Sequence, residues 1–238
     1  MADFRDFMIE IAELKVRLLC EFPYAKNLCA SFEIDECVPD IQVKVSPEEI
    51  DIEEDKYTDI SFSKGYCEGA CLYRAIAEQL PERDGFVFHG AAVEIDGKGV
   101  IFTAPSGTGK TTHISLLMKN YPDNVRVING DKPIIRKIDG EWRVFGTPWA
   151  GKEGWKRNAS APLSAIVIVN RAENNSIEAI APEMNFDQLI SQVYLPYQGK
   201  ATLLTFDLLN DIAGTVKFYR LNCNMDDSAA ETSYNELK

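Results

Sequence analysis

The chain has 238 residues, of which 45% are hydrophobic and 26% are charged, and both proportions are ordinary for a soluble globular protein. Its formal net charge of −12 argues against binding to nucleic acid or to an anionic membrane surface, because both are themselves negative. No apolar run is long enough to span a bilayer, and the first residues lack the basic start of a signal peptide. We therefore expect a cytoplasmic protein with no nucleic acid and no membrane among its partners.

The six cysteines fit the same compartment, because without an export signal thiols are expected to stay reduced. Cys67 and Cys71 are one helical turn apart and could share a metal ion with distant partners. No histidine lies near them in the sequence, and a free cysteine packs as a small apolar group. Buried structural cysteines are the favoured interpretation.

Residues 1–84 are predicted as a β-rich N-terminal layer with one helix. Alternating polar and apolar residues indicate strands at 9–16, in short segments between 28 and 45, and at 59–62. The acidic cluster at 51–55 is predicted as a solvated loop or turn. The helix is predicted at 66–80, where five apolar residues form a stripe: Cys67, Cys71, Leu72, Ile76 and Leu80.

Residues 85–238 are predicted as a second region of mixed strands and helices. Residues 85–94 read as one apolar strand, and 161–170 as a strand that is buried on both faces. The pairs Asp96-Gly97 and Asp139-Gly140 indicate tight hairpin turns. Further strands are predicted at 125–129, 133–138, 141–147 and 216–222, and helices from about 185, at 201–213 and at 227–238. The fold class is α/β, of the mixed α+β kind.

Residues 104–112, APSGTGKTT, are typical of a phosphate-binding loop, because a strand-like run precedes them and a helix-like run follows. Glycines let successive backbone N–H groups point at an anion, and the helix adds its positive N-terminal dipole. The usual first glycine of the motif is replaced by Ala104. The residues predicted to bind the cofactor are Ser106, Gly107, Thr108, Gly109, Lys110, Thr111 and Thr112.

Within this loop, Lys110 is predicted to reach the outer phosphates as a point charge, and the Thr111 hydroxyl to ligate Mg²⁺. A partner acid is also required, and the best candidate is Asp131, at the end of the first strand after the phosphate helix. Asn-Gly-Asp is also good turn chemistry, so a purely structural role for Asp131 stays open.

Three further positions are candidates for the site. His89 precedes Gly90, which would let a ligand approach closely, although a lone histidine in an apolar strand is usually a core residue. Arg171 follows a buried strand and could neutralise transferred phosphate, or be a surface arginine. His113 is predicted on the surface of the phosphate helix.

The segment GTPWAGKEGW at 146–155 is neither a good helix nor a good strand. Lys152 is predicted to contact the nucleotide, and Trp149 and Trp155 either stack on a ligand or anchor the loop on the core. As a mobile cover, the loop would close over the nucleotide or the acceptor.

Taken together, these segments resemble the HPr kinase/phosphorylase family and its small relatives, which share a core with ATP-dependent phosphoenolpyruvate carboxykinases. The resemblance covers roughly residues 85–222 and rests on FHGAAVEIDGKGVIFTAPSGTGKTT, VINGD, GTPWAGKEGW and the strand that ends at Asn170-Arg171. It implies a carboxykinase-like P-loop core below the β-rich layer. His89-Gly90 falls on the family's histidine-glycine pair, and Asp131 on one of its two adjacent aspartates.

The resemblance implies an ATP- and Mg²⁺-dependent phosphotransferase whose acceptor is a serine of a peptide or protein, or a small alcohol. The catalytic residues would be Asp131, Lys110, His89 and Arg171, and the metal contacts Thr111 and Asp131. Two departures matter: Gly130-Asp131 stands where the family has two aspartates, and the family's phosphorolysis loop is not recognisable. Two alternatives therefore remain, a non-catalytic nucleotide-sensing module of a peptide-maturation system and a phosphatase or ATPase.

Overall fold

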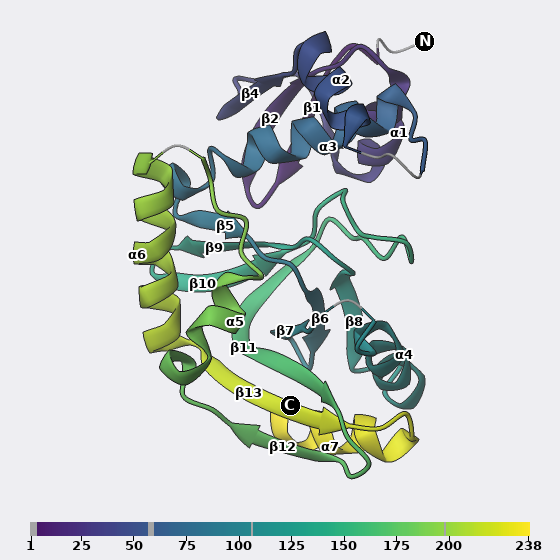
Figure 1. The fold of residues 1–238 in the computed structure, drawn as a ribbon, viewed down its shortest axis with the longest axis vertical. Coiled ribbons are helices and arrows are strands. Elements are labelled where there is room, and N and C mark those ends of the chain that lie inside the picture. Colours follow the sequence, from purple (N-terminus) through teal and green to yellow (C-terminus); the bar gives the residue numbers. More distant parts are fainter. Residues whose placement is uncertain (1–3, 57–59, 106, 198) are drawn as a thin grey trace.

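The computed structural model describes residues 4–56, 60–105, 107–197 and 199–238. It shows a mixed α/β protein in which an N-terminal layer, residues 4–84 as far as described, lies above a larger sheet with helices on both faces (Figure 1). The fold class is therefore mixed α/β, as expected. The division of the chain after residue 84 stays a prediction.

The N-terminal layer contains a four-stranded sheet in the order β3-β1-β2-β4. The single strand predicted at 9–16 is wrong, because Ala12 and Glu13 have positive φ and turn the chain between two antiparallel strands. The strands of this sheet are β1 (Asp6–Ile11), β2 (Leu14–Leu19), β3 (Glu33–Ile34) and β4 (Ile41–Lys44).

Three α-helices, where one was predicted, complete the described part of the N-terminal layer: α1 (Pro23–Cys29), α2 (Pro47–Asp55) and α3 (Lys64–Ala77). The predicted helix corresponds to α3, and its five-residue stripe is buried. Both Cys67 and Cys71 are buried free thiols, and the described residues contain no group of three His, Cys, Asp or Glu side chains that could hold a metal ion.

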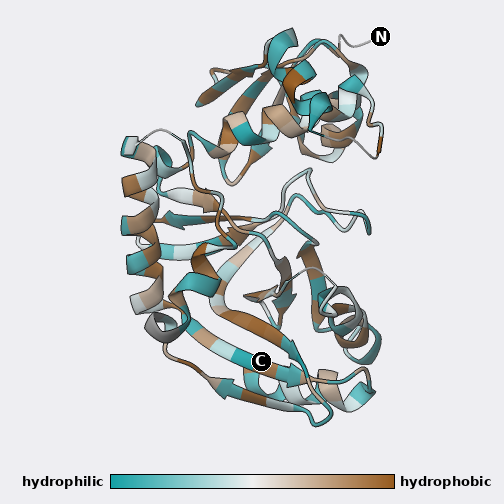
Figure 2. Cartoon of the chain, in the orientation of Figure 1, coloured by the Kyte–Doolittle hydropathy of each residue, from teal (hydrophilic) through white to brown (hydrophobic). Residues whose placement is uncertain are grey.

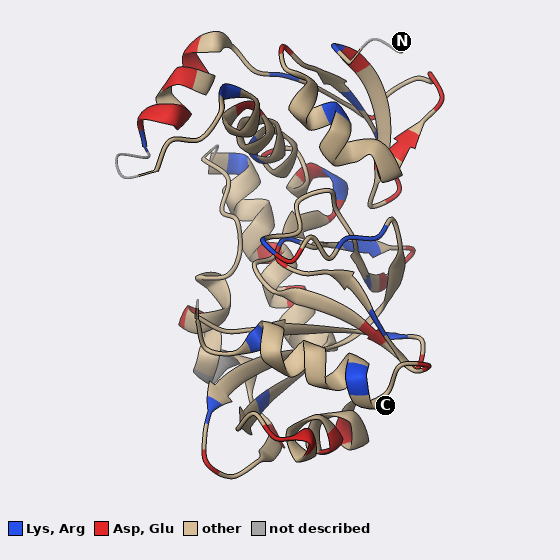
Figure 3. Cartoon of the chain, turned by 90° about the vertical axis from the view of Figure 1, so that its right-hand side faces the viewer, with Lys and Arg blue, Asp and Glu red and all other residues tan. Residues whose placement is uncertain are grey.

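The acidic segment 51–55 belongs to helix α2 and is not a loop (Figure 3, red). Ser46 and Glu49 form a capping box at its start, which stabilises the helix by satisfying exposed backbone N–H groups. Glu53 is buried and pairs with Arg74 of α3, so this acid holds two helices together. Residues 60–62 form no strand, and the rest of the strand predicted there lies outside the described residues.

The larger sheet is built around β11 (Ser160–Arg171), which runs parallel to β7 (Lys98–Thr103) on one side and to β13 (Lys217–Cys223) on the other. The apolar segment 85–94 forms two strands and not one. The regular strand conformation is interrupted at residues 88–90, and His89 lies in this interruption. The other strands of this sheet are β5 (Gly85–Val87), β6 (Ala91–Ile95), β8 (Val125–Asn129), β9 (Ile134–Ile138), β10 (Glu141–Phe145) and β12 (Ser176–Ala179).

Both hairpins predicted from Asp-Gly pairs are present, since β6 pairs with β7 and β9 with β10. The edge strand β12 was not predicted, because its short polar sequence has little strand character of its own. The helices of this region are α4 (Lys110–Asn120), α5 (Phe186–Ile190), α6 (Gly199–Thr215) and α7 (Asp227–Leu237).

Apolar side chains of the central strands are buried on both faces of the sheet. The apolar residues give the brown stretches of the ribbon in Figure 2. On one face, Val167 and its neighbours pack against α4 and α7, and on the other, Ile166 and its neighbours pack against α5 and α6. This alternation is why β11 reads as a continuous apolar run. Because β7, β11 and β13 run parallel to one another, their carboxyl ends lie at the same edge of this core.

Candidate functional site

The predicted phosphate-binding loop connects the end of β7 to the start of α4. Gly107 and Gly109 have φ of 78° and 119°, a region that favours glycine because a Cβ would be strained there. Ala104 keeps a negative φ, and its side chain is buried in the core with an exposed fraction of 1%. Alanine is therefore tolerated where the usual motif has its first glycine. Ser106 lies outside the described residues.

Lys110 and Arg171 both bond to carbonyl groups of this loop. Lys110 Nζ donates to Ala104 O at 2.9 Å, and burial lowers the pKa of this amine, while the charge of Asp131 opposes the shift. Arg171, at the end of β11, donates from Nε to Thr108 O at 2.8 Å and also bonds Gly107 O. Arg171 thus holds the loop in shape, in addition to its predicted role toward phosphate.

Asp131 lies in the turn that follows β8, between His89 and Lys132. Its Oδ1 is 3.2 Å from His89 Nε2, and its Oδ2 is 3.2 Å from Lys132 Nζ. The hydrogen bond from His89 lowers the pKa of Asp131 to about 2, with help from Lys132 and against the effect of burial. The carboxylate is therefore ionised at any physiological pH and is in contact with a histidine and a lysine.

The residue that sequence reasoning missed in this turn is Asn129. Its amide is fully buried, and its Oδ1 accepts hydrogen bonds from the backbone N–H groups of Asp131 at 2.9 Å and Lys132 at 2.7 Å. Its Nδ2 donates to Thr147 O at 3.0 Å and to Trp149 O at 3.3 Å. The Asn129 side chain therefore stabilises the Asn-Gly-Asp turn, and the signal for it is present in the sequence as an asparagine two residues before the acid. A role of Asp131 beyond this turn stays a prediction.

The segment 146–155 passes directly over this turn. A Cβ on Gly151 would lie 3.1 Å from Asp131 Cβ, so the backbone there approaches the acid closely. The following residues, Lys152 and Glu153, reach the loop, and Glu153 Oε1 accepts a hydrogen bond of 3.2 Å from Thr111 Oγ1. Glu153 was not predicted as a site residue, although it stands beside Lys152 in the unusual glycine-rich segment.

The two tryptophans of this segment anchor it. Trp149 Nε1 donates to Gly69 O of α3 at 3.0 Å, and its ring lies against Tyr73 with centroids 5.2 Å apart. Trp155 packs on the core of the larger sheet, and its carbonyl accepts a hydrogen bond of 2.8 Å from Gly130 N. These contacts favour the interpretation that the two tryptophans anchor the segment on the core over the one in which they stack on a ligand.

A polar cavity of about 490 Å³ is enclosed by these elements. Every predicted site residue that the structure describes lines it, which brings together residues from five separate parts of the chain. Their individual roles stay predictions. The predicted residues on this wall are His89, Gly107, Thr108, Gly109, Lys110, Thr111, Thr112, Asp131, Lys152 and Arg171.

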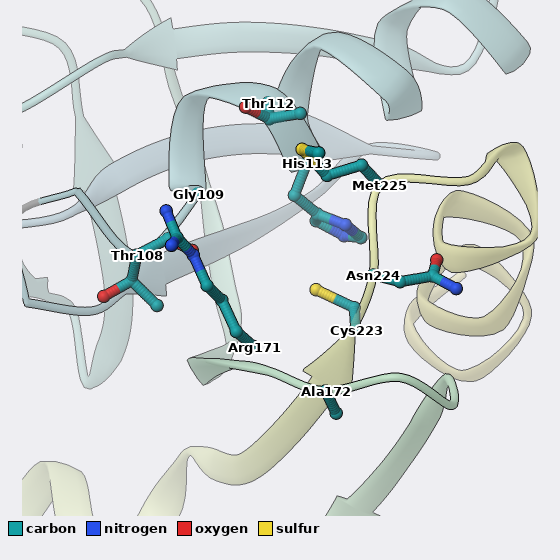
Figure 4. Close-up of a pocket in the computed structure, with 9 residues that line it drawn as sticks. All are labelled: Thr108, Gly109, Thr112, His113, Arg171, Ala172, Cys223, Asn224 and Met225. Atoms are coloured by element: carbon teal, nitrogen blue, oxygen red, sulfur yellow. The ribbon is translucent and has the colours of Figure 1, made fainter.

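A second cavity, of about 320 Å³, adjoins the first (Figure 4). The two share the walls formed by Thr108, Gly109, Thr112 and Arg171. Its far wall includes His113, and the predicted surface position of this residue is wrong, because its exposed fraction is only 2%. Helix α7 covers the imidazole, and burial lowers its pKa to about 4.

A third cavity, of about 300 Å³, lies where the N-terminal layer meets the larger sheet. Lys132 forms part of its wall, so the cavity begins one residue beyond Asp131. Its surface is dominated by aromatic side chains of both regions: Tyr24, Tyr66, Tyr73, Trp149 and Tyr194.

The family model of the SynChlorMet cassette protein ScmC matches residues 69–227, and the chain therefore belongs to the ScmC family. Among solved structures, the chain is similar to the Hpr(Ser) kinase/phosphatase from Coxiella burnetii, with 11% identity and a TM-score of 0.30. That match covers 52% of this chain and 86% of the other. No curated protein matches the sequence. In the part of the chain that the structure describes, no helix is both long enough and apolar enough to cross a membrane.

Proposed function

We propose that this member of the ScmC family is an ATP- and Mg²⁺-dependent kinase that transfers the γ-phosphate to a hydroxyl group. The observation that carries the proposal is the polar cavity, where a lysine, a threonine hydroxyl and two carboxylates surround a glycine loop at a helix N-terminus. Phosphoryl transfer is catalysed mainly by positioning and by charge stabilisation, and these groups supply both.

The backbone of the glycine loop and the N-terminus of α4 bind the phosphates in this proposal. Lys110 leaves its contact with Ala104 O and pairs with the outer phosphates, whose negative charge favours the protonated amine. Lys152, whose side chain lines the cavity from the loop above, adds a second positive charge there. Arg171 keeps the loop carbonyls turned away from the anion.

The oxygen donors of the cavity fit Mg²⁺, which prefers a few carboxylate and hydroxyl ligands together with phosphate and water. Thr111 Oγ1, Asp131 and Glu153 would hold the ion, and it would neutralise the phosphate charge that develops during transfer. Glu153 supplies the second acid that is missing from the Gly130-Asp131 pair. Its hydrogen bond to Thr111 keeps it beside the predicted metal contact.

Asp131 accepts the hydrogen bond of the acceptor hydroxyl and orients its oxygen toward the phosphate. A carboxylate with a pKa near 2 is a weak base, so its contribution is mainly orientation. The acceptor oxygen forms its bond to the γ-phosphorus as the bond to the ADP oxygen breaks, and the hydroxyl proton passes to Asp131 only late in this transfer. His89 and Lys132 fix the carboxylate from both sides. Both contacts constrain the direction from which the hydroxyl can arrive.

The acceptor enters from the aromatic cavity beside Lys132. Aromatic walls favour an apolar or aromatic group on the acceptor, and a volume of about 300 Å³ suits one large side chain better than a whole cofactor. The family description names a cassette protein, which fits an acceptor made by neighbouring cassette enzymes. A serine of a peptide or protein is the acceptor class proposed, with a small alcohol as the simpler case.

The alternative is a nucleotide-sensing module without catalysis, and the single aspartate of the Asn-Gly-Asp turn favours it. An ATPase or phosphatase would instead release phosphate without any acceptor. Incubation of the full chain with Mg·[γ-³²P]ATP, with and without serine-containing peptides, separates the three. The kinase transfers label to peptide, the ATPase releases labelled phosphate in both reactions, and the sensor does neither while still binding ATP.

Lys110→Ala tests the nucleotide part of the proposal. Calorimetry should show that this variant no longer binds Mg·ATP measurably, while Lys119→Ala at the other end of α4 binds normally, because Lys119 makes only an exposed ion pair with Asp227. Asp131→Asn should bind ATP within about tenfold of wild type but transfer at least roughly 10²-fold more slowly. Equal ATP affinity in wild type and Lys110→Ala would overturn the phosphate site.

A further inference from the structure

The second cavity shares a wall with the polar cavity that contains the glycine loop. Phosphates on the glycine loop occupy the polar cavity, and ribose joins them covalently to the base, so the base must lie in an adjoining space. The cavity of about 320 Å³ adjoins the polar cavity and shares with it the walls formed by Thr108, Gly109, Thr112 and Arg171. Its size is at the lower end of small-molecule sites, which suits one base.

The wall of this cavity is suited to a flat aromatic ring. Ala172 and Cys223 contribute small apolar surfaces from the ends of β11 and β13 (Figure 4). Met225 extends over the cavity from the segment before α7, although 77% of its surface is exposed to solvent. A flexible thioether that is otherwise exposed gains favourable contacts when it covers an aromatic ring.

His113, in the wall of this cavity, provides a polar group that can read the base. Ser233 Oγ donates to Ala230 O at 3.1 Å, so its oxygen accepts the Nε2–H of His113 at 3.0 Å. This assignment leaves a lone pair on Nδ1, which is buried and has no hydrogen-bond partner among the described residues. Because burial keeps the ring neutral, Nδ1 remains an acceptor at physiological pH.

The neighbouring amide does not compete for this role. Asn224 Nδ2 already donates to Glu173 O at 3.1 Å and to Asp226 Oδ2 at 3.0 Å, and its Oδ1 accepts from Asp226 N. The amide is therefore engaged on both sides and is directed away from a ligand. The other polar side chains of the wall that bond elsewhere are Thr108 and Arg171, which donate to loop carbonyl groups, whereas Thr112 adds a hydroxyl on the side of the glycine loop.

We propose that this cavity is the base subsite of the nucleotide and that it selects adenine, whose 6-amino group donates a hydrogen bond to His113 Nδ1. Guanine is disfavoured, because its 6-oxo group would place a second acceptor against the same lone pair. Met225 closes over the bound ring. The inference rests on the proposed function only in taking the glycine loop as the phosphate site, and the base and phosphate halves can be tested separately.

The test uses two partial ligands and the full chain. Adenosine, followed by saturation-transfer NMR, probes the base subsite, and inorganic tripolyphosphate, followed by calorimetry, probes the glycine loop. Ala172→Leu fills the base cavity with a larger side chain, and Ala179→Leu makes the same change at an exposed position of β12 as a control. Lys110→Ala removes the phosphate contact and leaves the base cavity untouched.

We expect Ala172→Leu to weaken adenosine binding by at least about fivefold and to leave tripolyphosphate binding unchanged. Lys110→Ala should abolish tripolyphosphate binding and retain adenosine. Purine riboside, which lacks only the 6-amino group, should bind roughly threefold to tenfold more weakly than adenosine, and guanosine no better. His113→Phe should make adenosine and purine riboside equal; if that variant does not fold, the comparison on the wild type still decides.

The inference is overturned if adenosine does not bind, if Ala172→Leu binds it as tightly as wild type, or if purine riboside matches adenosine. A chain that binds adenosine but not tripolyphosphate would keep the base subsite and overturn the phosphate half of the proposed function. A chain that binds tripolyphosphate but not adenosine would do the reverse. The failures of the two proposals are thereby distinguished.

Discussion

The buried amide of Asn129 holds Asp131 in place: its Oδ1 accepts the Asp131 backbone N–H at 2.9 Å, and its Nδ2 donates to two carbonyl groups of the segment 146–155. One side chain therefore sets the distance between the candidate acid and the loop that carries Lys152 and Glu153. Because the Asn129 amide is fully buried, water has no access to take the place of these hydrogen-bond partners.

Asn129→Ala should reduce both stability and transfer. The substitution leaves several buried backbone groups unpaired, so the free energy of unfolding should fall by about 2–4 kcal/mol in urea titrations. Phosphoryl transfer should fall further than ATP binding, since Asp131 loses its fixed position. Asn235→Ala, at an exposed position near the end of α7, should change the free energy of unfolding by less than about 0.5 kcal/mol. A stable Asn129→Ala chain with normal transfer would show that the amide does not position the acid.

Glu153→Gln should raise the Mg²⁺ concentration needed for half-maximal transfer by roughly tenfold or more. The amide can still accept the Thr111 hydrogen bond, but it loses the charge that attracts a divalent cation. Transfer measured against Mg²⁺ at saturating ATP gives the value directly. Glu173→Gln, on the exposed segment after β11, removes one negative charge elsewhere and should leave the Mg²⁺ requirement as it is. Identical requirements in the two variants would remove Glu153 from the metal site.

Ala70→Leu should block the aromatic cavity, because Ala70 of α3 forms part of its wall. The probe is N-acetyl-phenylalaninamide, whose binding should alter the fluorescence of Trp149, which also lines this cavity. The variant should need at least about fivefold more probe for the same change. Ala75→Leu makes the matched substitution on the same helix, at a residue that does not line the aromatic cavity, and this variant should respond like wild type. An unaltered response in Ala70→Leu would place the acceptor elsewhere.

His113 should make the protein less stable as the pH falls below 6.5. Its pKa is about 4 in the folded chain and about 6.5 when unfolded, so the unfolded state binds the proton first. The stabilisation is complete above pH 6.5 and is lost between 6.5 and 4. Between pH 7.5 and 5.5 the loss should be about 1 kcal/mol, measured by urea unfolding.

In His113→Gln this part of the pH dependence should disappear, whatever the variant's absolute stability. His89→Gln serves as the control, because it removes the other histidine and leaves His113 unchanged. Carboxylates that do not contact His89 titrate alike in all three chains, and Asp131, whose pKa His89 lowers from a usual value of 3.8, stays ionised between pH 7.5 and 5.5. A His113→Gln chain with the full wild-type slope would show that the imidazole is not buried as described.

Much of the site could be predicted from the sequence because its signals are local. Gly107 and Gly109 needed positive φ, and the two Asp-Gly pairs fixed hairpins, through interactions within a few residues. The placement of Asp131 followed from one rule about the ends of parallel strands. His89 was predicted within a strand but stands in the break between β5 and β6, and its contact with Asp131 depends on that break.

What could not be predicted depends on partners far away in the sequence. His113 is buried because Ser233, 120 residues later, packs on it from α7. The acidic helix α2 is stable because Glu53 meets Arg74 on another helix, which outweighs its polar composition. The strand β12 exists only because β13 offers it an edge to pair with. Glu153 gave no signal at all apart from its place in an irregular segment.

The hydrogen bond between the Trp149 indole and Gly69 has a consequence for any shortened form of the chain. The N-terminal layer and the larger sheet also share one apolar cluster, to which Val87, Ile134 and Phe145 contribute from the larger sheet. A chain that began at residue 85 would expose these three side chains to water and release the support of the segment over the phosphate loop. Removal of the N-terminal layer should therefore destabilise the larger sheet itself, independently of any ligand that the layer contacts.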